Sequence, residues 1–216
     1  MKNILFLFIL FIFSSCKSQS VETSKNAKNS QKVISDTSFV RFKSFSKDFN
    51  FDLKYATSDN FLKTKVYNCA ECYLRYKTVK KLIEINSILK LQGLKIKLFD
   101  CYRPLDVQKK MWKLVPNTNY VADPKKGSVH NRGCAVDLTL VTLKGVALDM
   151  GTTFDFFGEQ ANHDYQNLSD LIISNRKFLK KVMLDNGFKS INSEWWHYNL
   201  IDGLNDKVAN FNWECK

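Results

Sequence analysis

The fold is decided by the stretch Ser128-Val129-His130-Asn131-Arg132-Gly133-Cys134-Ala135-Val136-Asp137. Gly133 lets a loop turn into a strand that we expect to run over residues 134–141. Side chains alternate along a strand, so one face carries Ala135, Asp137 and Thr139. Asp137 therefore lies on the polar face, and His130, on the preceding loop, can fold back over it.

A second polar segment, Glu194-Trp195-Trp196-His197, completes a set of metal ligands. A catalytic zinc takes three protein ligands and leaves its fourth position to water. His130, Asp137 and His197 would fill the three protein positions. Glu194 is then free to accept a proton from the bound water. Strict alternation would send Glu194 and His197 to opposite faces, so a turn or bulge at Glu194 is predicted if both residues approach one metal.

Taken singly, each of these residues has a structural interpretation. A lone histidine is usually a half-buried, hydrogen-bonded side chain, and we interpret His163 in this way because it has no partner motif. The combination of His-x6-Asp with Glu-x-x-His is what favours a metal site. Asp and His ligands would also accept divalent ions other than zinc.

Three motifs carry a family resemblance: Ser128-x-His130-x-x-Gly133-x-Ala135-x-Asp137, Glu194-Trp195-Trp196-His197 and Tyr102-Arg103-Pro104. In these the chain resembles the D-alanyl-D-alanine dipeptidases, the zinc D,D-dipeptidases of the vancomycin-resistance type, over about residues 52–198. The resemblance implies one zinc ion per chain, held by His130, Asp137 and His197. It further implies that Glu194 is the catalytic base and that Arg103 steadies the charged transition state.

Further matches extend the resemblance to the substrate. Tyr55-Ala56-Thr57, Phe154-Asp155-Phe156 and Ser128 correspond to family segments. They imply that Tyr55, Ser128 and Asp155 hold the dipeptide, Asp155 through the ammonium group. From the residues alone, Tyr55 could equally cover the core, and Asp155 could be a turn carboxylate.

The predicted fold class is α+β. Apolar spacing predicts helices over residues 74–92, 104–114 and 170–186, and strands over 51–55, 94–98 and 195–200. A polar loop is expected over residues 117–127, and a loop rich in phenylalanine with the acids Asp149 and Asp155 over residues 149–158. The resemblance adds a small, largely antiparallel sheet with packed helices and a single zinc site at the sheet edge.

The beginning of the chain predicts export. Residues 4–13 are almost wholly apolar, too few to span a bilayer but typical of a signal peptide. Small residues directly before Cys16 indicate a lipoprotein signal over residues 1–15, with lipid on Cys16; the alternative is an ordinary signal with a chance cysteine. The polar composition of residues 16–36 predicts a flexible tether, and residues 37–216 are predicted to form the catalytic domain. The predicted location is periplasmic or at the cell surface.

The formal net charge is +12, and the basic residues are dispersed along the chain. No nucleic-acid-binding motif accompanies them. A solvated basic surface that favours anionic lipid or cell-wall polymer is the better interpretation.

The cysteines beyond Cys16 leave pairing open. Cys69 and Cys72 form one Cys-x-x-Cys, for which a local disulfide or free thiols are favoured over a second zinc. Cys101 and Cys134 each flank a proposed catalytic element, so a disulfide between them is a hypothesis.

The predicted function is hydrolysis of D-Ala-D-Ala by a zinc metallopeptidase. One alternative is a D,D- or L,D-carboxypeptidase or endopeptidase that acts on longer peptidoglycan peptides. Another is a non-catalytic, zinc-containing wall-binding lipoprotein. A structural zinc usually closes its fourth position and needs neither Glu194 nor Arg103, which argues against the last.

Overall fold

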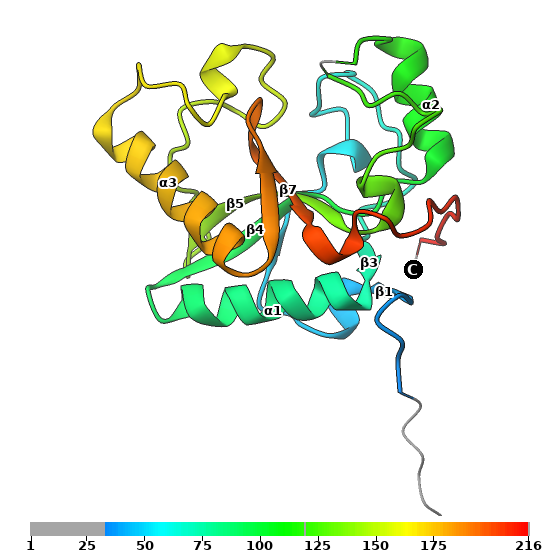
Figure 1. Cartoon of the computed structure of the whole chain (residues 1–216), viewed down its shortest axis with the longest axis horizontal. Coiled ribbons are helices and arrows are strands. Elements are labelled where there is room, and N and C mark those ends of the chain that lie inside the picture. The colour runs from blue at the N-terminus through cyan, green and yellow to red at the C-terminus, as the bar shows by residue number, and fades with distance from the viewer. Residues whose placement is uncertain (1–32, 119, 216) are drawn as a thin grey trace, which may run out of the picture. The chain divides into compact units, whose positions relative to one another are not determined.

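Figure 1 shows the computed structural model, which describes residues 33–118 and 120–215. The predicted signal peptide, Cys16 and most of the tether lie outside these residues. Ile34–Lys216 forms one compact unit. In the described part of the chain, no helix has the length and apolar character needed to cross a membrane.

A five-stranded sheet forms the centre of the unit, and only its β2–β4 pair is parallel. This confirms the largely antiparallel α+β prediction. In spatial order its strands are β2 (Asn50–Phe51), β4 (Leu94–Asp100), β5 (Ala135–Thr142), β7 (Glu194–Leu200) and β6 (Phe188–Ile191). A separate two-stranded sheet pairs β1 (Phe39–Arg41) with β3 (Tyr73–Arg75).

The predicted helices are present as α1 (Tyr76–Lys90), α2 (Leu105–Leu114) and α3 (Asp170–Asp185). Figure 1 shows α1 running along the sheet, against β4, while α3 packs against β6 and β7. These helices share one core with the sheet, to which α1 contributes Val79, Leu82, Ile85 and Leu89. α2 instead joins a second apolar cluster with Tyr55 and Tyr67.

The predicted strand over residues 51–55 is wrong in its second half. β2 ends at Phe51, and Lys54–Ala56 forms a 3-10 turn. The backbone carbonyl of Tyr55 accepts hydrogen bonds from the amides of Val66 and Tyr67, not from a neighbouring strand. Burial of the Tyr55 side chain in the second cluster therefore overrides the strand pattern.

The irregularity predicted near Glu194 is confirmed. Ser190 of β6 pairs with Tyr198 of β7, but the next residue, Ile191, pairs with Glu194. Residues 195–197 therefore have no counterpart on β6, and β7 bulges there. The bulge lets Glu194 and His197 approach the same side of the sheet.

The site lies at one end of the inner strands. Asp100, the last residue of β4, pairs with Asp137 of β5, and Asp137 pairs with His197 of β7. These three residues form a row across neighbouring strands. The resemblance implied a site at the edge of the sheet. The site lies instead at the ends of β5 and β7, which are both inner strands.

The cysteine predictions were wrong. The disulfides are Cys69–Cys215 and Cys72–Cys101, and of the described cysteines only Cys134 is unpaired. The amide of Tyr102 donates to the carbonyl of Tyr73, which sets Cys72 and Cys101 side by side. Cys101 is bonded to Cys72 and so cannot pair with Cys134, whose Sγ lies 3.6 Å from a carboxylate oxygen of Asp206. Burial raises the pKa of the Cys134 thiol to about 11, so it is an inert thiol in the folded chain.

Candidate active site

The three predicted metal ligands come together. His130 lies in a 3-10 turn that Gly133 ends in a left-handed conformation, while Asp137 and His197 project from β5 and β7. His130 Nε2 is 3.2 Å from His197 Nδ1 and 3.4 Å from Asp137 Oδ2. His197 Nδ1 is 3.0 Å from Asp137 Oδ1.

The outer nitrogens of both imidazoles have acceptors. His130 Nδ1 lies 2.8 Å from the carbonyl oxygen of Cys101, and His197 Nε2 lies 3.0 Å from Asn199 Oδ1. Since an oxygen without a proton can only accept, each outer nitrogen carries the hydrogen. The lone pairs of both inner nitrogens then face each other and Asp137. Such an arrangement is repulsive unless a cation lies among them.

The spacing of these atoms fits a zinc ion. Tetrahedral zinc with bonds of about 2.0–2.1 Å places its ligand atoms about 3.3 Å apart. Burial alone would raise the pKa of Asp137, but positive charge and hydrogen bonds from protonated His130 and His197, whose place a bound cation would take, hold this pKa well below its usual range. Asp137 is therefore an anionic ligand. The set leaves one side open, toward a cavity of about 330 Å³.

Glu194 lines that cavity beside the ligands. Its Oε2 lies 3.8 Å from His197 Nδ1, and its side chain is 25% exposed, so solvent or substrate can reach it. Burial raises the pKa of Glu194, and the positive charge of His197 opposes this only in part. A carboxylate of raised pKa next to the open metal position is suited to take up and return a proton.

Arg103 lines the same cavity from the turn between β4 and α2. Its Nε and Nη2 donate to Asp100 Oδ2 at 3.1 and 2.7 Å, and its Nη1 donates to Gln108 Oε1 at 2.9 Å. These bonds use three of the five guanidinium N–H groups. Burial alone would lower the pKa of Arg103, but the charge of Asp100 raises it well above its usual value. Arg103 is therefore a fixed, buried cation.

The predicted substrate residues also border the cavity. The hydroxyl of Tyr55 donates to Asp155 Oδ2 at 2.9 Å. Asp155 has a φ of 57°, a left-handed conformation that is uncommon outside glycine and often marks a functional site. Burial, and next the charge of Asp137, raises the pKa of Asp155 well above its usual range. Ser128 Oγ accepts from the amide of His130 at 3.2 Å and so also supports the metal-binding turn.

Comparison with known proteins assigns the family. A family profile described as D-ala-D-ala dipeptidase matches residues 35–214. The chain belongs to this family. The predicted resemblance is thereby confirmed, and the chain is a peptidase.

Individual relatives agree with the family assignment. The D-alanyl-D-alanine dipeptidase of Escherichia coli (strain K12) is 38% identical over 153 residues, 71% of this chain and 79% of that protein. The D-alanyl-D-alanine dipeptidase of Enterococcus faecium is 32% identical over 173 residues, 70% of this chain and 86% of that protein. Among solved structures, the vancomycin-resistance D,D-pentapeptidase VanY in complex with Zn(II) overlaps with a TM-score of 0.40 at 13% identity, covering 60% of this chain and 74% of that one.

The structure adds residues to the site of this family member that the motifs did not identify. Asp100 and Gln108 hold Arg103, and Asn199 holds His197. Asp100 stands three residues before Arg103 at a strand end, which is the one sequence signal that could have indicated it. His163 lies outside the cavity, and burial lowers its pKa to about 4.

Proposed function

We propose that this peptidase hydrolyses the dipeptide D-Ala-D-Ala at a single zinc ion, with Glu194 as general base. The observation that carries the proposal is the convergence of two imidazole lone pairs and Asp137 next to Glu194 and Arg103 in one cavity. The names of the relatives from E. coli and E. faecium support the same substrate.

The residues divide the chemistry among them. Zinc, when bound by His130, Asp137 and His197, supplies Lewis acidity and lowers the pKa of a bound water toward neutrality. Glu194 takes a proton from the attacking water and returns it to the leaving amine. Arg103 faces the scissile carbonyl and stabilises the negative charge that develops on its oxygen.

Asp155 would bind the free amino end of the dipeptide substrate. Tyr55 occupies one of its carboxylate oxygens, and the other can accept from the ammonium group of the dipeptide. A longer wall peptide, the substrate of the alternative carboxypeptidase or endopeptidase, would bring an uncharged amide to this buried carboxylate. Burial and the charge of Asp137 disfavour the ionised form of Asp155, and an ammonium group beside it would offset both, so the site favours the free dipeptide over an uncharged amide.

The test is a substrate panel with detection of released D-alanine by ninhydrin. We expect D-Ala-D-Ala to be cleaved, activity to disappear with a chelator, and added Zn²⁺ to restore it. N-acetyl-D-Ala-D-Ala should be cleaved about 10²-fold more slowly or worse, because it lacks the ammonium group. Faster cleavage of the acetylated form would favour the carboxypeptidase, and zinc binding without any hydrolysis would favour the wall-binding lipoprotein.

We also propose that the peptidase is exported and anchored by lipid on Cys16. Support comes from the apolar run before Cys16 and from two disulfides, which persist in oxidising compartments. In a bacterial host, the intact chain should fractionate with membranes, whereas Cys16→Ser should release it or leave it unprocessed. Equal solubility of both chains after export would contradict the anchor.

A further inference from the structure

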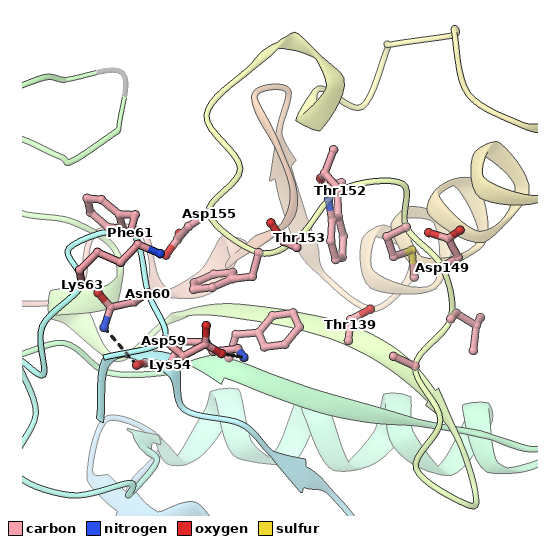
Figure 2. A pocket seen from close by; sticks show the side chains of 16 residues that line it. Lys54, Asp59, Asn60, Phe61, Lys63, Thr139, Asp149, Thr152, Thr153 and Asp155 are labelled. Carbon is pink, nitrogen blue, oxygen red and sulfur yellow. Dashed lines mark hydrogen bonds and ion pairs between the residues drawn. The ribbon is translucent and has the colours of Figure 1, made fainter. Parts of the chain in front are cut away.

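The segment that follows the last strand contacts residues next to the active site. Residues 206–215, the tail segment, form no helix or strand, and Figure 1 shows them in red beside β1 and β3. Figure 2 shows a larger cavity, of about 660 Å³, which shares Asp155 with the catalytic one. No residue of the tail segment lines either cavity. It can therefore act on the reaction only through the residues that it contacts.

The tail segment is attached to both turns of the active site. One of its amides donates to the carbonyl of Asn131 at 2.8 Å. The amide of Phe211 donates to the hydroxyl of Tyr102 at 2.9 Å, and the two rings stack with centroids 4.5 Å apart. Asn131 directly follows His130 in the chain. Tyr102 directly precedes Arg103, so the tail segment contacts the neighbours of a metal ligand and of the buried cation.

A more direct connection leads to Arg103 through Tyr67. The buried hydroxyl of Tyr67 donates to Asp100 Oδ1 at 2.7 Å, while Asp100 Oδ2 accepts both bonds from Arg103. Burial, and next the charge of Asp100, raises the pKa of Tyr67 well above its usual value, so its hydroxyl keeps the proton that it donates. The amide of Cys101 also donates to Oδ1, at 2.9 Å. Asp100 is thus held at both oxygens, which fixes the guanidinium bonded to it.

Trp213 of the tail segment packs on the ring of Tyr67. The two rings meet edge to face with centroids 5.4 Å apart, and Trp213 stacks on Tyr73 at 5.5 Å. Tyr67 stands two residues before Cys69. Trp213 likewise stands two residues before Cys215, so the Cys69–Cys215 disulfide joins the two segments next to this ring contact. A segment without helix or strand is mobile unless it is attached, and the disulfide attaches this one.

We propose that Tyr67 and Trp213 are positioning residues for Arg103, and that the disulfide beside them secures both. The inference rests on the proposed function, in which Arg103 stabilises negative charge on the carbonyl oxygen of the substrate. That role requires a guanidinium that is already fixed before the charge develops. Without the hydroxyl of Tyr67, Asp100 has one bond fewer to set its orientation, and the guanidinium loses its orientation with it. Neither positioning residue lines the catalytic cavity, so substrate binding should not change.

The experiment measures kcat and KM on D-Ala-D-Ala, together with zinc content and thermal stability. Tyr67→Phe, which removes only the hydroxyl, should lower kcat about tenfold and leave KM within about twofold. In the Arg103→Lys chain, the same change should lower kcat no further, because its effect passes through the guanidinium. Tyr73→Phe is the matched control and should leave kcat unchanged. Its ring also packs on Trp213, but its hydroxyl has no hydrogen bond within the described residues.

The contribution of the tail segment is measured with the full chain. Trp213→Ala should lower kcat about fivefold, and Trp213→Phe, which keeps an aromatic ring against Tyr67, should restore most of it. Joint replacement by Cys69→Ser and Cys215→Ser should lower kcat by a similar factor. These assays are run below the unfolding temperature of every variant, and zinc content should stay unchanged.

The outcomes separate this inference from the proposed function. An unchanged kcat in Tyr67→Phe, or a loss that persists in the Arg103→Lys chain, would overturn the inference and leave the proposed function standing. Lower thermal stability with unchanged kcat in the cysteine variant would overturn the part assigned to the disulfide. Failure of the unchanged chain, with zinc bound, to cleave D-Ala-D-Ala would contradict the proposed function and the inference that rests on it.

Discussion

Replacing Glu194 with glutamine should lower kcat on D-Ala-D-Ala by about 10³- to 10⁴-fold and leave zinc bound. Glutamine has the same shape but cannot accept the proton of the attacking water. The proposed metal ligands are His130, Asp137 and His197, so the affinity of the site for zinc should survive the change. Steady-state kinetics and metal analysis of the same preparation measure both quantities.

Glu159→Gln is the matched control for this variant. Glu159 is an exposed acid that lines a neighbouring cavity together with Glu194 but does not border the catalytic one. Its replacement should leave kcat unchanged. Normal turnover in Glu194→Gln would remove Glu194 as the base, and loss of zinc from that variant would make Glu194 a ligand.

The candidate ligands could be named from the sequence because they stand in two short motifs, His-x6-Asp and Glu-x-x-His. Alternation along a strand fixed the face of Asp137, and the Glu-x-x-His spacing required the bulge that β7 contains. The pairing of Asp137 with His197 on neighbouring strands, however, depends on the register of distant segments. The spacing of the motifs indicates which residues share a site, but it does not give the distances between their side chains.

Features that depend on distant segments were not predictable. Cys69 pairs with Cys215 near the end of the chain, and a Cys-x-x-Cys spacing gives no sign of such a partner. The strand predicted through Tyr55 failed for the same reason, because the second apolar cluster draws that side chain away from the sheet. The left-handed conformation of Asp155 and the cavity behind it likewise arise from packing of the loop on the sheet.

Arg103→Lys should reduce kcat/KM on D-Ala-D-Ala by about 10²- to 10³-fold. Arg103 bonds Asp100 through two nitrogens and Gln108 through the third, while the same planar group faces the cavity. A lysine has a single nitrogen, which cannot bind Asp100 and also reach the carbonyl oxygen of the substrate. Steady-state kinetics should show mainly a lower kcat, because charge on that oxygen develops in the transition state.

Arg132→Lys separates this effect from a general loss of arginine. Arg132 lies in the same turn as His130, but its guanidinium donates to the backbone carbonyl of Asp206 and does not border the catalytic cavity. Its replacement should leave kcat within about threefold of the unchanged chain, since the contact is remote from the carbonyl. If Arg103→Lys behaved like this control, the developing charge would be stabilised by the metal alone, and the contacts of Arg103 with Asp100 and Gln108 would serve only to join β4 to α2.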